Sequence, residues 1–445
     1  MKIKYIYKYL ILAFVAVILG SCTSTEADQK FDETPLERLN GRKKELNDLL
    51  LSSAEGWKAV YYTDSTQLGG WTHLFKFLPD GKVDMASDYD ADTAVKRSQY
   101  DIQLGSAVSL VFTTANRIHL LSESDNYPTA ALVGKGYLGD FQFFYYGQEN
   151  GEIIFKTNRA FHELRFVKAT AKDWTDLPKN TPIIKAITGE ITSPLFRVLE
   201  ENDGTAIKKY EFDFNPTARF GTAYSLVEGS EEAFQVALSF TPTGAVAKPA
   251  VVVKGQKLSN FTYDSVSNSF IATGTGGVSA TIKYTNAPPR LTDDYKKLAE
   301  GQPQFVIGYL SANLYTASTT SDYFKSLSAK VNATLPATQS LARVQIIFNN
   351  AVNGTYIQYL FNGGKATITH FVTTEIDDVN KTIILTDDGW TQSAAAVAFL
   401  KPIDNELLNV KGLYVKKENF TITYSNPIYT VTSASSSFRM TTYQL

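Results

Sequence analysis

Three aspartates at alternate positions form the densest set of metal-ligand side chains in the sequence. They are Asp88, Asp90 and Asp92, within the stretch DYDAD. Carboxylates spaced in this way can turn their oxygens toward one Ca²⁺ as a loop curls. The pattern then departs from an EF-hand, because Thr93 stands where glycine is needed and Gln99 where a bidentate glutamate belongs. The motif predicts either a calcium site or the solvated end of a hairpin.

Other residue patterns that carry chemistry are weak. The histidines are scattered, and none belongs to a zinc-binding H-E-x-x-H: His73, His119, His162 and His370. No G-x-S-x-G elbow and no phosphate-binding glycine loop occurs in the sequence. Distant carboxylates can still converge in a fold, which keeps a hydrolase with an unrecognised carboxylate site as an alternative. We expect a protein that is not an enzyme, with no cofactor apart from the calcium candidate.

Cys22 is the only cysteine among 445 residues, and it follows a segment with the features of an export signal. A short lysine-rich start precedes an apolar run over residues 10–19, about half of the roughly 20 residues that span a bilayer. The ending Leu19-Gly20-Ser21-Cys22 resembles the lipobox of bacterial lipoprotein precursors. That resemblance implies a signal peptide over residues 1–21, cleavage before Cys22, and lipid on its sulfur and its new amine. Two or more acyl chains hold a protein stably at a membrane.

Composition sets further bounds. With its one cysteine lipidated, the chain has no thiol for an internal disulfide, so a buried core must stabilise it. Hydrophobic residues make up 44% of the chain and aromatic residues 13%, which is ample for such a core. The formal net charge is −2 and no basic cluster occurs, so nucleic acid is excluded as a partner.

A tether and a helix come first among the elements that position these residues. Residues 22–30 are polar and without an apolar period, which is typical of a flexible tether. Thr34 can then cap a helix, Pro35 suits its first position, and Glu37 completes a capping box. Leucines fall on one helical face up to Gly56, where we expect the helix to end. This helix should lie with its leucines against a sheet.

From residue 57 to residue 168 the apolar period is two, as in half-buried antiparallel strands. The clearest alternating sets are Phe75/Phe77, Val83/Met85, Phe141/Phe143/Tyr145, Ile153/Phe155 and Leu164/Phe166. Glycine-containing turns separate about nine short strands, enough for a curled meander, a barrel or a sandwich. Similar strands continue in the second half, with short helices expected over 293–300 and 322–331.

The predicted fold class is mainly β with few helices. An antiparallel meander, barrel-like or sandwich domain led by one helix should be followed by one or two further strand-rich domains. Two prolines and polar residues interrupt the pattern between the first domain and the rest, which indicates a linker. The expected divisions are 31–172 for the first domain, 173–185 for the linker, 186–285 for a second β domain or subdomain, and 286–445 for a C-terminal one.

One internal echo pairs residues 264–271 (DSVSNSFI) with residues 377–384 (DDVNKTII). Each is a polar turn that enters an apolar strand. Duplication of a domain and common hairpin chemistry both account for it.

Aromatic residues are abundant, with 25 tyrosines and 27 phenylalanines, and exposed aromatic faces are platforms for sugars and peptides. In a strand, Tyr61-Tyr62 and Tyr145-Tyr146 must each point one ring to either face. Strand cores use the same residue types, so the sequence assigns no ligand-binding residue.

Several short segments are informative when they are taken together. They are Phe31-Asp32-Glu33-Thr34-Pro35, Glu37-Arg38, Gly56-Trp57-Lys58, Gly69-Gly70, Asp80-Gly81-Lys82-Val83, Met85-Ala86-Ser87-Asp88 and Gly139-Asp140-Phe141. Together they resemble a Bacteroidetes lipoprotein family catalogued as domain of unknown function 4302. The resemblance is clearest over 31–167 and continues to the C-terminus. Genes of that family commonly lie near SusC/SusD-type uptake systems, which implies an accessory role in nutrient or iron capture. It implies a TonB-dependent transporter or a SusD-like protein as partner, and no catalytic residues.

Other short segments bear on sorting and modification. Thr23 after the lipidated cysteine suits the outer membrane, whereas Glu26 and Asp28 are too far apart for a tight acidic export signal. The periplasmic face and the cell surface therefore both stay open. Three tripeptides resemble the Asp-Ser/Thr-apolar acceptor of O-glycosylation in exported Bacteroidetes proteins, and their acceptors are Ser65, Thr93 and Ser265.

The leading hypothesis is thus a non-enzymatic, membrane-anchored lipoprotein that binds a ligand or a partner for an outer-membrane uptake system. A secreted-side hydrolase is the first alternative, and a structural or adhesive surface protein is the second.

Overall fold

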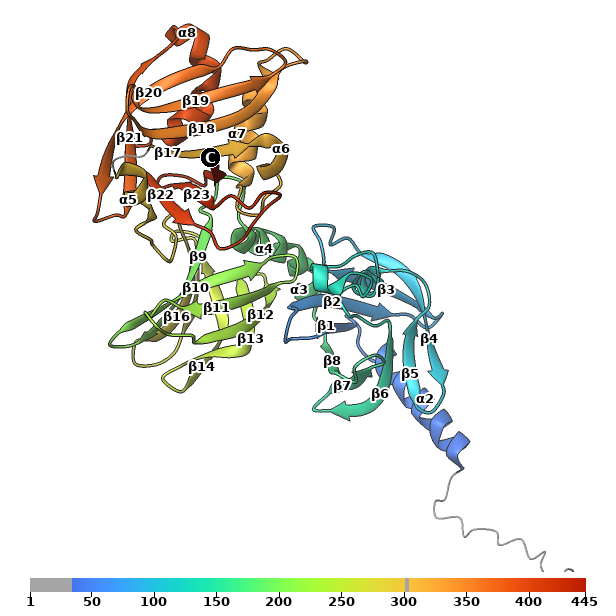
Figure 1. Cartoon of the computed structure of the whole chain (residues 1–445). Coiled ribbons are helices and arrows are strands. Elements are labelled where there is room, and N and C mark those ends of the chain that lie inside the picture. The colour runs from blue at the N-terminus through green and yellow to red at the C-terminus, as the bar shows by residue number, and fades with distance from the viewer. Residues whose placement is uncertain (1–33, 301–303) are drawn as a thin grey trace, which may run out of the picture.

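A computed structural model describes residues 34–300 and 304–445. Cys22, the predicted signal peptide and the predicted tether lie outside the described residues. Strands β1 to β24 form three closed antiparallel barrels of eight strands each. We call them barrels 1, 2 and 3 in chain order. Figure 1 shows them in a bent row, with helix α2 at one end and barrel 3 at the other.

Barrel 1 contains β1 (Trp57–Tyr62), β2 (Gly70–Phe77), β3 (Lys82–Ser87), β4 (Lys96–Leu104), β5 (Val108–Phe112), β6 (Gln142–Glu149), β7 (Glu152–Thr157) and β8 (Glu163–Lys168). Barrel 2 contains β9 (Phe196–Asp203), β10 (Ile207–Asn215), β11 (Phe220–Ser225), β12 (Ala233–Thr241), β13 (Gly244–Val253), β14 (Gln256–Asp264), β15 (Ser269–Thr273) and β16 (Val278–Thr285). Barrel 3 contains β17 (Phe305–Leu310), β18 (Ser340–Asn350), β19 (Gly354–Asn362), β20 (Ile368–Asp377), β21 (Thr382–Trp390), β22 (Leu413–Lys417), β23 (Ile428–Ser433) and β24 (Arg439–Gln444).

The described helices are short apart from the first. They are α2 (Pro35–Leu51), α3 (Ala171–Asp176), α4 (Asn180–Thr188), α5 (Asp294–Ala299), α6 (Ser311–Leu314), α7 (Asp322–Ala333), α8 (Ala394–Val397) and α9 (Lys401–Leu407), with 3₁₀ turns η1 (Arg117–Leu121), η2 (Ala130–Leu132), η3 (Leu177–Lys179) and η4 (Ala398–Leu400). Helix α7 and the helix α5 fall where the sequence predicted helices. Within the described ranges, no helix has the length and apolarity needed to cross a membrane.

The capped start of α2 is confirmed. The Thr34 hydroxyl accepts the Glu37 backbone N–H at 3.3 Å, and the Glu37 carboxylate accepts the Thr34 N–H at 2.8 Å. The predicted end at Gly56 is wrong, because α2 ends at Leu51. Gly56 instead has a φ of +75°, and a Cβ there would lie 2.0 Å from the Phe75 carbonyl oxygen. It is glycine because a neighbouring strand passes so close.

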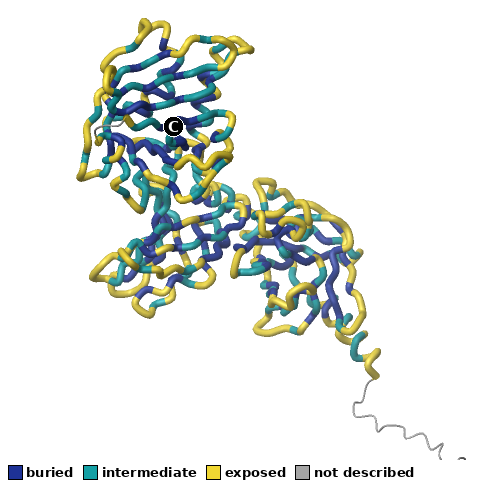
Figure 2. Tube along the Cα trace, viewed as in Figure 1, coloured by how far each residue is buried: buried dark blue, intermediate teal, exposed yellow. Residues whose placement is uncertain are grey.

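Alternating side chains fill barrel 1, as the period of two predicted. Phe75, Phe143 and Phe166 are among the fully buried rings, and Leu46 and Leu50 of α2 pack against the same core. Figure 2 shows the first turns of α2 exposed beyond the barrel. The region has eight strands rather than nine, and they close as a barrel instead of a sandwich.

The segment expected to be a linker, 173–185, is helical. It belongs to α3, η3 and α4, and Ile183 and Ile187 of α4 pack into the core of barrel 2. Its two prolines fall in the first turns of η3 and α4, where no intrahelical N–H donor is required. Proline therefore ends neither helix.

The internal echo does not mark equivalent positions. Residues 264–271 join the sixth and seventh strands of barrel 2, whereas 377–384 join the fourth and fifth strands of barrel 3. In both turns an aspartate carboxylate accepts the N–H groups two and three residues on. Asn268 and Lys381 then adopt positive φ values of 48° and 60°. Hairpin chemistry explains the echo.

Candidate functional site

The buried carboxylate of Asp88 links barrel 1 to barrel 2 through hydrogen bonds and an ion pair. It accepts the Thr72 backbone N–H at 2.9 Å and the Asn180 amide at 2.8 Å. It also pairs with Arg219 at 3.0 Å, and both side chains of this ion pair are at most 3% exposed. Because a buried charge needs a partner, this arrangement occupies Asp88 fully.

Arg219, in the turn between β10 and β11, provides the barrel 2 side of this contact. Its guanidinium lies over the rings of Trp71 and Phe240, with centroid distances of 5.4 and 5.2 Å, and donates to the Gly70 carbonyl at 2.9 Å. A Cβ at Gly69 would lie 2.4 Å from the Cβ of Arg219. The Gly69-Gly70 pair is therefore needed because the two barrels touch there.

The other two aspartates of the motif face a different arginine. Asp90 and Asp92 both form ion pairs with Arg117, which is buried. Hydrogen bonding from Lys96 is the largest of the causes that lower the pKa of Asp92 to about 2. Within residues 34–300 and 304–445, no group of three or more His, Cys, Asp or Glu side chains is placed to hold a metal ion. The three aspartates therefore do not share one partner, since Asp88 pairs with Arg219 whereas Asp90 and Asp92 pair with Arg117.

The histidines lie apart, as their spacing suggested. His73 is buried in barrel 1 with neither ring nitrogen bonded, and burial lowers its pKa to about 3. His119 stacks on Phe141, and His162 contacts the Thr63 carbonyl at 2.8 Å. Their contacts are those of structural residues.

His370 in barrel 3 belongs to a network that the sequence gave no sign of. Its ring nitrogens lie 2.7 Å from Asp404 and 2.7 Å from Asp387, and Trp390 stacks on it with a centroid distance of 3.9 Å. The Tyr359 hydroxyl donates to Asp404 at 2.9 Å. These side chains come from three strands and one helix, so only the closed barrel brings them together.

The predicted glycosylation acceptors all lie in turns or loops. In each tripeptide the aspartate carboxylate accepts the backbone N–H two residues on. Ser265 is exposed, whereas Ser65 and Thr93 are half-buried. Of the tyrosine pairs, Tyr61 and Tyr145 are buried, Tyr62 donates to Ser239 of barrel 2 at 2.8 Å, and Tyr146 is 53% exposed.

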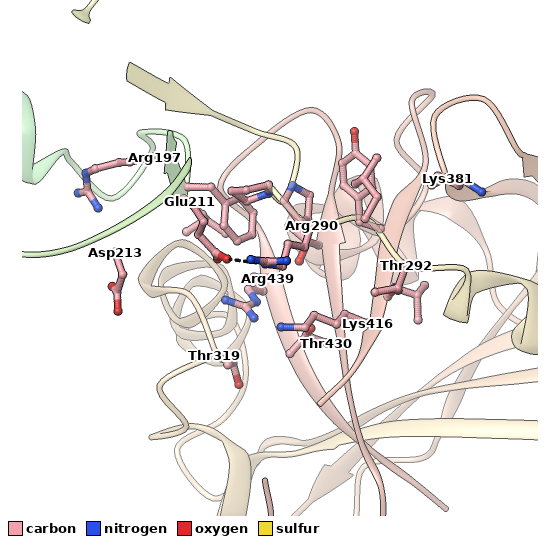
Figure 3. Close-up of a pocket in the computed structure, with 18 of the residues that line it drawn as sticks. Arg197, Glu211, Asp213, Arg290, Thr292, Thr319, Lys381, Lys416, Thr430 and Arg439 are labelled. Atoms are coloured by element: carbon pink, nitrogen blue, oxygen red, sulfur yellow. Dashed lines mark hydrogen bonds and ion pairs between the residues drawn. The ribbon is translucent and has the colours of Figure 1, made fainter. Parts of the chain in front are cut away.

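A cavity of about 560 Å³ lies where barrel 2 meets barrel 3, and we call it the junction cleft. Strands β9 and β10 of barrel 2, the connector 288–292, and β22 to β24 of barrel 3 line it. Figure 3 shows the cationic ends of Arg290, Arg439 and Lys416 in the middle of the view, with Arg197 and Lys381 toward its margins. The cleft is thus lined by charged side chains from three separate parts of the chain.

Two carboxylates face the three central cations. Arg290 lies 3.5 Å from Glu211, the pair joined by a dashed line in Figure 3. Glu418, which is buried, contacts Arg439 at 3.1 Å and Lys416 at 3.2 Å. Burial is the largest influence on Arg439 and lowers its pKa, while Glu418 and Glu211 act in the opposite direction. Positively and negatively charged side chains are therefore close together in the cleft and partly buried.

A second cavity of about 560 Å³ lies beside barrel 2, where the hydroxyl of Tyr210 touches two carboxylates. The Tyr210 hydroxyl lies 3.0 Å from Glu201 and 3.1 Å from Glu232, so these carboxylate oxygens are at most about 6 Å apart. This upper bound admits the separation of about 5–5.5 Å in retaining glycosidases. Burial raises the pKa of Glu201, whereas a hydrogen bond from Lys208 lowers that of Glu232. Opposed shifts of this kind suit an acid and a base.

Sequence reasoning did not find either cavity. Residues of the junction cleft extend from 195 to 439 and form no motif. The only signal was the predicted division between 186–285 and 286–445, because ligand sites commonly occur at boundaries between domains.

The fold defines a tandem array of three eight-stranded meander barrels. Residues 27–265 match the family described as "Domain of unknown function (DUF4302)", which is more than half of the chain. The chain therefore belongs to this family, as the resemblance predicted. The matched segment takes in α2, barrel 1 and barrel 2 as far as β14.

No curated protein matches the chain. Among solved structures, the DNA polymerase sliding clamp from Bacillus subtilis is 11% identical over 91% of this chain and 96% of that chain. Its TM-score of 0.15 is too low to indicate a common fold.

Proposed function

We propose that this protein is a non-enzymatic, membrane-anchored binding protein that holds a small ligand in the junction cleft. The observation that carries this proposal is the cleft itself, where side chains of two barrels and their connector converge. Its volume of about 560 Å³ falls within the range of about 300–1,000 Å³ for ligand sites, which favour domain boundaries.

The chain is attached through lipid on Cys22 to the outer membrane, where it assists nutrient or iron uptake beside a TonB-dependent transporter or a SusD-like protein. The lipobox-like ending at Cys22 and the family resemblance of residues 31–167 support this setting. Barrel 1 precedes barrels 2 and 3 in the chain, so the whole of barrel 1 separates the anchor from the junction cleft (Figure 1).

Anchoring is tested by metabolic labelling of cells with palmitate. The native chain should carry the label and sediment with membranes, whereas Cys22→Ala should lose the label and leave the membrane fraction. Val410→Ala, at an exposed position without an assigned role, serves as the control and should behave as the native chain. A labelled, membrane-bound Cys22→Ala variant would overturn the anchor.

A hydrolase is the second candidate, and the paired carboxylates Glu201 and Glu232 favour it. Glycan turnover by the purified chain separates the two candidates. Our proposal expects none. Turnover that falls about 100-fold or more in Glu201→Gln, but persists in Glu228→Gln on an exposed loop of the same barrel, would assign a hydrolase instead.

A further inference from the structure

Two arginines of the junction cleft, Arg290 and Arg439, have few acceptors, whereas Arg197 donates to the Ile187 and Thr188 carbonyls and to the Tyr284 hydroxyl. A guanidinium carries five N–H donors. Among the described residues, the Arg439 guanidinium donates one hydrogen bond, to Glu418, and its Nε is buried without a partner. Arg290 donates to the Ser225 carbonyl at 2.6 Å, and its 3.5 Å approach to Glu211 is an ion pair at the limit of hydrogen-bond length. Both side chains keep donors for a further acceptor.

Charge in the cleft points the same way. Five cations line the cleft, and four carboxylates either line it or pair with these cations, which leaves one positive charge in excess. The cations are Arg197, Arg290, Lys381, Lys416 and Arg439, and the carboxylates are Glu211, Asp213, Asp293 and Glu418. The chain as a whole carries a formal net charge of −2, so this local excess of positive charge runs against its average. In a partly desolvated cleft an uncompensated cation attracts an anion more strongly than on an open surface.

The cleft walls supply contacts for the rest of a ligand. Thr319 adds a hydroxyl group that shares a hydrogen bond with Thr441 at 2.7 Å and can make a second one, and the Phe196 ring lies under Arg439 with a centroid distance of 5.7 Å. Such a surface accommodates a hydroxylated or partly apolar body behind a charged group.

We propose that the junction cleft binds a ligand carrying an oxyanion group, a carboxylate, sulfate or phosphate, which Arg290 and Arg439 clamp. Arginine suits this task because its planar fork matches the two oxygens of such a group. The inference rests on the proposed binding function and adds the chemical class of its ligand. A neutral ligand of the same size would leave the positive charge without a counterion.

The test is calorimetric titration of the full mature chain with galacturonate, inorganic sulfate and inorganic phosphate, and with galactose as the neutral counterpart of galacturonate. At least one anion should bind, and it should bind more tightly than galactose. The anion that binds distinguishes a carboxylate ligand from a sulfated or phosphorylated one. Equal binding of galactose and galacturonate, or no binding of any anion, would overturn the inference.

Variants locate the site. Arg439→Gln and Arg290→Gln should each weaken anion binding about tenfold or more, as expected for loss of a charge-assisted contact. Arg439→Lys keeps the charge and the fold-stabilising pair with Glu418 but loses the fork, so it should weaken binding too. Arg97→Gln, an exposed arginine of barrel 1, is the matched control and should bind as the native chain. Unchanged binding in all three cleft variants would place the anion elsewhere and overturn the inference.

This outcome is separate from failure of the binding function. If no anion binds but a neutral glycan does, and Arg290→Gln abolishes that binding, the ligand class is wrong while the cleft remains the binding site. If the cleft variants affect no ligand and the native chain turns over glycans, both proposals fail.

Discussion

Replacing Asp88 with alanine should strongly destabilise the unit formed by barrels 1 and 2. The substitution removes an acceptor for Thr72, Asn180 and Arg219 at once. The guanidinium of Arg219 is 3% exposed, so water cannot replace the lost carboxylate. A buried charge that loses its partner costs about 3–5 kcal/mol of the free energy of unfolding.

The double variant isolates the ion pair from its surroundings. Asp88→Ala with Arg219→Met removes both charges, so it should be less destabilising than the sum of the two single changes, with a coupling of about 2 kcal/mol or more. Asp48→Ala is the control, because the Asp48–Lys44 pair on α2 is largely exposed and should not affect the unfolding midpoint.

Urea unfolding followed by tryptophan fluorescence measures the effect. Trp57 and Trp71 are buried in barrel 1, and Trp390→Phe removes the reporter of barrel 3. With a slope of about 3 kcal/mol per M urea, Asp88→Ala should lower the midpoint by about 1–2 M. A midpoint equal to that of the native chain, or strictly additive single effects, would refute the role assigned to this pair.

Three other predictions follow from local packing and chemistry. Gly69→Ala should destabilise by about 1–3 kcal/mol, because its Cβ would clash with Arg219, whereas Gly41→Ala, exposed in α2 with nothing within 4 Å, should stabilise by about 0.5–1 kcal/mol; equal urea midpoints for the two would contradict this. His73 has a folded-state pKa of about 3 against an ordinary 6.5, so the unfolded chain binds the proton first and stability falls as the pH drops below about 6.5, by about 1.4 kcal/mol per pH unit. His73→Phe should lose that part of the pH dependence, and an identical slope from pH 7 to pH 5 would show that His73 does not titrate as described. The intact mass of the native protein should exceed polypeptide plus lipid, and a mass without that excess would exclude modification at all three acceptors: Ser65, Thr93 and Ser265.

The fold was largely readable from local patterns. Thr34 and Glu37 predicted the start of α2, and the alternation through Phe75 and Phe143 predicted strands with one buried face. The sequence did not predict closure into a barrel, because closure depends on the pairing of β1 with β8. The paired residues of these two strands lie more than 100 residues apart in the sequence. Two prolines suggested a linker where helices form, because their effect depends on their position within a helical turn.

The site was much less predictable, for the same reason of distance. The sequence pattern around Asp88 resembled a calcium-binding loop. Its ion-pair partner Arg219 belongs to the next barrel, so no local pattern predicted the buried pair. Arg290 and Arg439 belong to no motif and meet only because the connector brings barrel 3 against barrel 2. Only folding places these two arginines in the same cleft, so the sequence could not predict their common role.

Recovery of a partner from native outer membranes tests the proposed function most directly. The tagged chain, solubilised in mild detergent with Cys22 intact, should co-purify with a TonB-dependent transporter or a SusD-like protein, and the Cys22→Ala variant should recover much less of it. The same purified chain should show no turnover of glycans or peptides. Absence of any such partner, together with turnover that is lost when Glu201 or Glu232 is replaced by glutamine, would contradict the proposal and assign the chain to the hydrolases.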